Sequence, residues 1–496
     1  MEESIYGAER MSYKDLIKGS FTLTFASLIS NLGAMLLLPL YVSLITPTQF
    51  GIVGLLQPVT EGTSALMIFG IYAAMRRDVI DLEDNTKEMG IYFSTIHIFL
   101  LIWNLVLIVG LSLPVTRSIY TKVLGLQQTP SIYLGLSIIN GSFIGFQMLA
   151  NSYFQYRRRY TFLTVTSVIG FVLTNIFSLS IIFSTKDGVL GKLLGSTLAM
   201  VVMLTLLYRP FIKIFTLGFR WKYIKGCLYF GYPLVITSFL GMVVSKSSRF
   251  ILANTVTMND LGIYTVAYTI ASVLSFVIVS FNSVWIPQFF KMMKDGVNDE
   301  SIGTYIVEFS VVLGIVSIFG QLFINVAAKI LLNDKYVGVA HFVTIMLPIF
   351  VVMGISQVIS NYFQYYQRNI IQTLIVVLMA GINVTLYWFF IPRFGLDVAI
   401  ISEVLLRYFI LLLYFVVILK MFKHRFGYLK ITVVIIFVMN PILFKIAENT
   451  WSVPISILMK LIYFFVALFV YSKLIPKENI ALLISNFKHK PDVQID

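Results

Sequence analysis

Long, continuously apolar stretches follow one another along almost the whole chain of 496 residues and constrain its fold more than any other feature. Each stretch has about the length, roughly 20 residues, that an α-helix needs to cross the hydrocarbon core of a bilayer. The stretches cover residues 21–45, 50–75, 89–114, 131–156, 161–184, 189–208, 227–253, 262–287, 304–328, 339–366, 370–392, 396–419, 429–447 and 454–475. Only 12% of the residues are Asp, Glu, Lys or Arg, about half the share of an ordinary soluble domain. The chain is therefore neither a soluble enzyme nor a disordered regulator.

We expect an all-α polytopic membrane protein with about 14 transmembrane helices. The apolar runs lack the alternating pattern of a membrane β-barrel. A single cysteine, Cys227, excludes a disulfide framework and a thiolate metal site. His97 and His341 stand alone, so we expect no metal and no cofactor.

The distribution of basic residues predicts the orientation of the chain. If the N-terminus is cytoplasmic, the inner segments carry 25 of the 37 Lys and Arg residues and the outer segments carry 7. This asymmetry is typical of loops retained in the cytoplasm, and it predicts an even number of spans with both termini inside. The net charge of +14 accordingly records topology and contact with membrane lipids, and nucleic acid is not an expected partner. Acidic residues in 1–20 argue against a cleavable signal peptide.

The two halves of the chain resemble each other at an offset of 207 to 211 residues. Tyr153-Phe154-Gln155-Tyr156 recurs as Tyr362-Phe363-Gln364-Tyr365, and Thr46 through Gly51 is echoed by Thr257 through Gly262. Six predicted spans separate the copies, so the halves have the same orientation and form a parallel repeat. Two such lobes around a central cavity predict alternating access rather than a channel, since no segment resembles a selectivity filter.

The repeat predicts where the chain divides. We expect two six-helix lobes, a basic linker between them, two additional C-terminal helices and a cytoplasmic segment at each end. The predicted boundaries are 1–20 for the N-terminal segment, 21–208 for the N-lobe, 209–226 for the linker, 227–419 for the C-lobe, 420–475 for spans 13 and 14 with their basic loop, and 476–496 for the tail.

The order of these motifs resembles a known family. Leu261-Gly262-Ile263-Tyr264-Thr265-Val266-Ala267, followed by Pro287 at the end of the eighth predicted span, is similar to the polysaccharide transporters of the MOP exporter superfamily. Phe50-Gly51-Ile52 is a weaker copy, and Gly188, Gly191 and Gly395 fit the same pattern. Within that superfamily the chain most resembles the O-antigen (Wzx-type) flippases.

The resemblance implies a MATE-like fold and a carrier that moves undecaprenyl-pyrophosphate-linked sugar repeat units from the inner to the outer leaflet. It also implies the bacterial cytoplasmic membrane, a monomeric carrier, and polysaccharide polymerase or assembly proteins as partners. A multidrug or metabolite antiporter of the same fold is the alternative. A membrane glycan polymerase is less favoured, because the longest predicted outer loop, about 115–130, has no His, Asp or Glu.

Charged residues inside predicted spans are costly and are therefore candidates for the transport site. Lys246 and Arg249 lie three residues apart on the seventh span, and an ammonium with a guanidinium suits a pyrophosphate. The resemblance points to the same stretch, although Ser248 stands where the family often has an acidic residue. The alternative is that both side chains extend to the outer interface.

Two further charged groups and one motif complete the predicted site. Glu61 could bind H⁺ or Na⁺ as the coupling ion, or make a structural hydrogen bond. Arg407 is spaced i,i+4 from Glu403, which favours an ion pair, and it is otherwise a second phosphate contact. Tyr153, Tyr156, Tyr362 and Tyr365 form either an aromatic belt or a cytoplasmic gate where aromatic rings stack on sugars.

Overall fold

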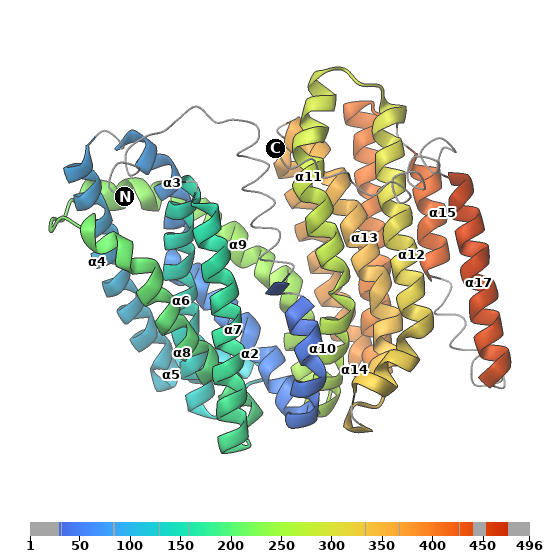
Figure 1. Cartoon of the computed structure of the whole chain (residues 1–496), viewed down its shortest axis with the longest axis horizontal. Coiled ribbons are helices and arrows are strands. Elements are labelled where there is room, and N and C mark those ends of the chain that lie inside the picture. Colours follow the sequence, from blue (N-terminus) through green and yellow to red (C-terminus); the bar gives the residue numbers. More distant parts are fainter. Residues whose placement is uncertain are drawn as a thin grey trace, which may run out of the picture. The chain divides into compact units, whose positions relative to one another are not determined.

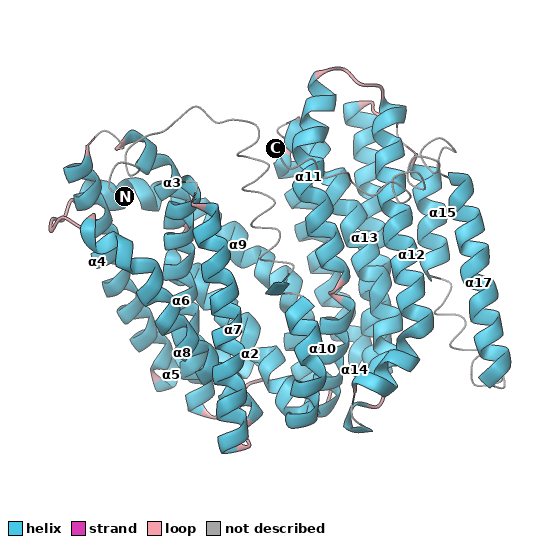
Figure 2. Cartoon of the chain, viewed as in Figure 1, coloured by secondary structure: helices cyan, strands magenta, loops and turns pink. Residues whose placement is uncertain are grey.

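The computed structural model of the chain describes residues 29–30, 32–82, 85–127, 129–157, 159–332, 334–366, 368–425, 427–439 and 453–474. In these residues the regular elements are helices, with no strand among them (Figure 2). Ten of the described helices are long and apolar enough to cross a membrane, and two shorter apolar helices, Leu32–Leu44 and Tyr428–Met439, accompany them. The all-α polytopic fold is confirmed, and the count of 14 spans stays a prediction. The expected cytoplasmic segments 1–20 and 476–496 lie outside the described residues.

The chain forms two compact units, Met1–Thr265 and Val266–Asp496. Unit 1 holds Leu32–Leu44 and the elements α2 (Pro47–Ile68), α3 (Ile71–Asp81), α4 (Thr86–Ser112), α5 (Pro114–Leu124), α6 (Ser131–Tyr156), α7 (Tyr160–Thr185), α8 (Gly188–Tyr208), η1 (Arg209–Lys213), α9 (Trp221–Thr255) and the first part of α10 (Met258–Ala271) (Figure 1). Unit 2 holds α11 (Leu274–Lys294), α12 (Asp299–Leu331), η2 (Asp334–Tyr336), α13 (Val339–Tyr365), α14 (Asn369–Val417), η3 (Ile418–Phe422), α15 (Tyr428–Met439) and α17 (Val453–Leu474).

The contact-based division places α9 in unit 1. This helix begins the second copy of the repeat, yet it packs against α2, α3, α4 and α5. Its first residues, from Trp221, occupy part of the stretch expected to be a linker. The contacts of α9 assign it to the first half of the chain, whereas the sequence repeat assigns it to the second half. The six-plus-six lobes therefore remain a prediction.

The second predicted span is broken rather than continuous. It consists of α2 and α3, separated by Phe69 and Gly70, both with positive φ (49° and 68°). A Cβ atom at Gly70 would lie 2.6 Å from the Gly231 carbonyl oxygen, so glycine is required both by the backbone conformation and by the approach of α9. The eighth predicted span is also interrupted, between α10 and α11, but without a residue of positive φ.

A helix that ends inside a membrane must have partners for its last carbonyl groups, because lipid offers none. Trp103 Nε1 donates to the Leu66 carbonyl oxygen (3.1 Å), and Asn104 Nδ2 donates to that of Met67 (3.3 Å). Ser142 on α6 donates to Asn104 Oδ1 (2.6 Å) and orients the amide. Side chains of α4 and α6 therefore stabilise the interruption of α2.

The repeated Thr motif caps a helix in both copies. Thr46 Oγ1 accepts from Gln49 N–H, while Gln49 Oε1 accepts from Thr46 N–H, which is a capping box at the start of α2. Thr257 Oγ1 likewise accepts from Asp260 N–H at the start of α10. The sequence similarity thus reflects a local requirement of helix initiation.

The two capped helices meet through equivalent glycines. A Cβ atom at Gly262 would lie 1.7 Å from the Pro47 carbonyl oxygen, and one at Gly51 would lie 2.3 Å from that of Met258. Pro47 and Met258 occupy matching repeat positions, as do the two glycines, so each copy contacts the other in the same way. Glycine is required here because the two backbones are in direct contact.

The free energy of unfolding of the Gly262→Ala variant is expected to fall by about 1–3 kcal/mol, because its methyl group would displace the Pro47 backbone. Thermal unfolding of the full chain in detergent measures this as a lowered midpoint. Gly135→Ala on α6 is the matched control, since a Cβ atom there has no neighbour within 4 Å. An unchanged midpoint for Gly262→Ala would contradict the contact.

Candidate functional site

Arg249 occupies the centre of the candidate site, on α9 where this helix packs against α2. Its side chain is buried, with only 5% of its surface exposed. Nη1 donates to the Gly54 carbonyl oxygen (3.1 Å) and to Gln57 Oε1 (3.2 Å). A Cβ atom at Gly54 would lie 2.4 Å from Thr265 Oγ1, so glycine at this position allows the close approach of Thr265. In this conformation Arg249 is thus directed toward α2 and not toward the outer interface.

Gln57 connects Arg249 to the predicted coupling residue. Its Nε2 donates to Glu61 Oε1 at 2.9 Å, one turn farther along α2. The three side chains therefore form a row in which an amide lies between a guanidinium and a carboxyl group. The sequence singled out Arg249 and Glu61 separately, and the structure brings them together through Gln57. This function of Gln57 had no signal in the sequence beyond its i,i+4 spacing from Glu61.

Lys246 lies on α9 one turn before Arg249, but its side chain is outside the described part of the chain. Whether the predicted Lys246–Arg249 pair binds one substrate group stays a prediction. Glu61 is partly exposed and Gln57 is exposed, so the two polar groups of α2 are more accessible than the buried guanidinium.

Arg407 forms the ion pair that its spacing from Glu403 favours. Arg407 Nη2 and Nε donate to Glu403 Oε1 at 2.8 and 3.2 Å, and the Tyr387 hydroxyl donates to Glu403 Oε2 at 3.2 Å. These residues of α14 lie in unit 2 and are mostly buried. A second phosphate contact by Arg407 would have to compete with this carboxylate.

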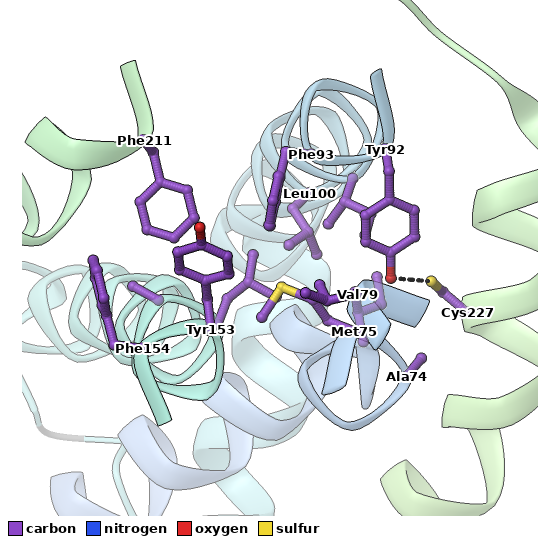
Figure 3. Packing of buried hydrophobic residues seen from close by; sticks show 14 of the residues in the cluster. Ala74, Met75, Val79, Tyr92, Phe93, Leu100, Tyr153, Phe154, Phe211 and Cys227 are labelled. Carbon is purple, nitrogen blue, oxygen red and sulfur yellow. Dashed lines mark hydrogen bonds between the residues drawn. The ribbon is translucent and has the colours of Figure 1, made fainter. Parts of the chain in front are cut away.

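The first Tyr-Phe-Gln-Tyr copy contributes to an aromatic core at one end of α6. Tyr153, 4% exposed, lies 4.7 Å from Phe211 and 5.2 Å from Phe93 between ring centroids (Figure 3). In the same cluster Tyr92 and Cys227 are within hydrogen-bonding distance at 3.5 Å. Tyr156 ends α6, and its side chain is not among those described.

The second copy is buried in the same way at the end of α13. Tyr362 is fully buried against Phe289, with ring centroids 4.8 Å apart, and Tyr365 packs against Phe290 at 5.8 Å. Buried tyrosines do not form a lipid-facing belt, which corrects that interpretation for Tyr153 and Tyr362. Sugar stacking would require this packing to open, and the gate stays a prediction.

His424 is a polar centre that the sequence analysis missed. Its Nδ1 lies 2.5 Å from Asp299 Oδ1, and its Nε2 lies 2.5 Å from the Tyr366 hydroxyl. Desolvation raises the pKa of Tyr366, and Tyr365 and Asp299 act in the same direction. Tyr366 therefore stays protonated, and its hydroxyl shares a hydrogen bond with His424. This network joins the start of α12, the end of α13 and the residues after η3.

Lys192 on α8 is a further cationic side chain within a predicted span, and the sequence analysis gave it no function. Its Nζ lies 3.6 Å from the centroid of the Tyr41 ring and 5.8 Å from that of Phe50. Cation–π contact is one way to keep an ammonium within an apolar helix bundle. In the described residues no group of three or more His, Cys, Asp or Glu side chains could hold a metal ion.

Comparisons with known proteins bear on this geometry. The family described as "Polysaccharide biosynthesis protein" matches residues 16–293, more than half of the chain. No curated protein matches the sequence. Two solved structures are similar in fold, both over nearly their whole length. A lipid II flippase, MurJ, in an inward closed conformation gives a TM-score of 0.68 at 13% identity, covering 92% of this chain and 99% of that one. An inward-facing multidrug resistance MATE family transporter of the MOP superfamily gives 0.61 at 15% identity, covering 86% and 96%.

The Glu403–Arg407 pair allows a test of burial energetics. Glu403→Leu and Arg407→Leu should each lower the unfolding midpoint, corresponding to up to about 3–5 kcal/mol, because each leaves a mostly buried charge without its partner. The double variant should recover much of this loss, because no charge remains. Additive losses in a double-mutant cycle, measured by thermal unfolding, would contradict the ion pair.

Proposed function

The chain belongs to the polysaccharide biosynthesis protein family of the MOP superfamily, and we propose that it is a flippase for undecaprenyl-pyrophosphate-linked oligosaccharides. Repeat units of O-antigen or capsular polysaccharide would move from the inner to the outer leaflet of the bacterial cytoplasmic membrane. The transport would proceed by alternating access, with both termini in the cytoplasm and with H⁺ or Na⁺ as the coupling ion.

The buried guanidinium of Arg249 is the observation that carries this proposal. Its two identified acceptors, Gly54 O and Gln57 Oε1, are uncharged oxygens of α2. Phosphate oxygens bear a full negative charge and are stronger acceptors for a guanidinium than amide oxygens are. A pyrophosphate that entered between α2 and α9 could therefore replace both. The positive charge favours an anionic lipid over a cationic drug.

Glu61 is the group of the site best suited to bind the coupling ion. It is a carboxyl group within a membrane protein, it is partly exposed, and it is connected to Arg249 through Gln57. Lys246 would supply further positive charge, and Arg407 in unit 2 is a separate proposed phosphate contact. The tyrosines of the repeated motif would contact sugar rings when their packing opens. Polymerase or assembly proteins would receive the flipped lipid.

A multidrug antiporter is the second candidate, favoured by the similarity in fold to a MATE family transporter. An exporter of cationic drugs would need an acidic cavity, whereas the candidate site is built around Arg249. Energy-dependent efflux of a cationic dye that is lost in Arg249→Ala would favour the antiporter over the flippase.

Deletion of the gene should leave lipid-linked sugar repeats in the cytoplasmic leaflet, as measured by leaflet-specific labelling. Wild-type protein should restore outer-leaflet repeats, and Arg249→Ala should reduce them about tenfold or more, because a contact between opposite charges is lost. Lys329→Ala, an exposed cation in the last turn of α12, is the control and should restore transport. Unchanged surface glycan in the deletion strain would rule out the flippase.

Glu61→Gln should abolish the dependence of transport on pH or Na⁺, because an amide neither releases a proton nor carries charge. Reconstituted vesicles in which pH and Na⁺ are varied separately provide the measurement. Transport that keeps its wild-type dependence on both ions would remove Glu61 from coupling.

A further inference from the structure

The donors and acceptors of the three side chains fix the direction of the hydrogen bonds in the row Arg249–Gln57–Glu61. A guanidinium has hydrogen-bond donors and no acceptor, so Gln57 must present its oxygen to Arg249. Its NH₂ group then points along α2 to Glu61, as the 2.9 Å contact requires. Reversing the amide would place its donors against the donors of Arg249. Gln57 can therefore satisfy both partners in one orientation alone.

This polarity makes the two hydrogen bonds of Gln57 cooperative. An ionised Glu61 attracts the NH₂ group and polarises the amide, which strengthens its oxygen as an acceptor for Arg249. A proton or Na⁺ at Glu61 removes that negative charge and weakens both bonds. The state of the carboxyl group thus determines how firmly α2 retains the guanidinium of α9.

The three side chains of the row differ in how deeply they are buried. Arg249 is buried against Gly54, whereas Gln57 is exposed and Glu61 is partly exposed. The carboxyl group of Glu61 is thus more exposed than the guanidinium of Arg249, which is packed between α9 and α2. Gln57 spans the separation between them, because it is hydrogen-bonded to both residues.

We propose that Gln57 is a positioning residue that couples cation binding at Glu61 to the availability of Arg249 for a pyrophosphate. The inference rests on the proposed function, and it adds the residue that connects the two sites and the sign of their coupling. Neutralising Glu61 weakens the hydrogen bond between Gln57 and Arg249, so pyrophosphate binds more tightly when the cation is bound. By linkage, pyrophosphate raises the affinity for the cation by the same factor.

The test measures binding of geranylgeranyl pyrophosphate, an isoprenyl pyrophosphate without sugars, to the purified full chain by titration calorimetry. Wild-type protein should bind it about fivefold or more tightly at pH 6 or in high Na⁺, conditions that favour a cation at the carboxyl group, than at pH 8 without Na⁺. In Gln57→Leu the ratio measured with and without Na⁺ at constant pH should fall to near one, with tighter binding than wild type at pH 8. The ionisation of the probe itself is common to all variants, so the comparison of ratios isolates the protein.

Gln127→Leu, an exposed glutamine of unit 1 outside the row, is the matched control and should keep the wild-type ratio. The asparagine side chain in Gln57→Asn is too short to reach both partners, so its affinity ratio should also fall to near one. This variant replaces Gln57→Leu if the leucine variant does not fold. Glu61→Gln should bind at the tight limit under all conditions.

The outcomes separate the two proposals. Wild-type protein that binds no probe contradicts the pyrophosphate site itself. A wild-type ratio retained in both Gln57 variants overturns the coupling by Gln57 and leaves the flippase proposal intact. Wild-type binding that responds to neither pH nor Na⁺ also overturns the coupling, while pyrophosphate binding stands.

Discussion

The requirement that every backbone polar group has a partner governs this structure, because lipid supplies no hydrogen bonds. The requirement explains why the described chain is helical, and it becomes most demanding where α2 stops at Phe69 and Gly70. The side chains of Trp103 and Asn104 donate hydrogen bonds to the last carbonyl oxygens of α2 and so stabilise the break. α2 can thus end within the bundle, and its polar face stays next to α9.

Close backbone contact positions α2 against α10. Gly51 and Gly262 bring α2 and α10 together, and Gly54 allows Thr265 of α10 to approach α2. A guanidinium can be buried in an apolar bundle when carbonyl and amide oxygens surround it. These glycines hold α10 against α2, whose Gly54 carbonyl oxygen and Gln57 amide oxygen accept hydrogen bonds from Arg249.

The repeated motifs lie at matching places, at the starts of α2 and α10 and at the ends of α6 and α13. The structure shows capping and packing contacts for them, and the gate stays a prediction. The first Tyr and Phe of both Tyr-Phe-Gln-Tyr copies are buried in aromatic clusters, which a belt of residues at the membrane surface would not be. Apolar patterning could not reveal this, because a tyrosine at the end of a helix can face lipid or the core. Likewise, the Thr46 and Thr257 motifs turned out to be helix caps.

The sequence by itself determined the class of fold, the positions of most helices, the family and the identity of Arg249 and Glu61 as unusual charges. Length, hydropathy and charge depend on local composition, so they could be read along the chain. The break in α2, the burial of Tyr153, the network at His424 and the place of α9 in unit 1 depend on contacts between distant residues. Only the tertiary structure decided that Gln57 lies between Arg249 and Glu61, because no local pattern encodes which oxygen a guanidinium 192 residues away will find.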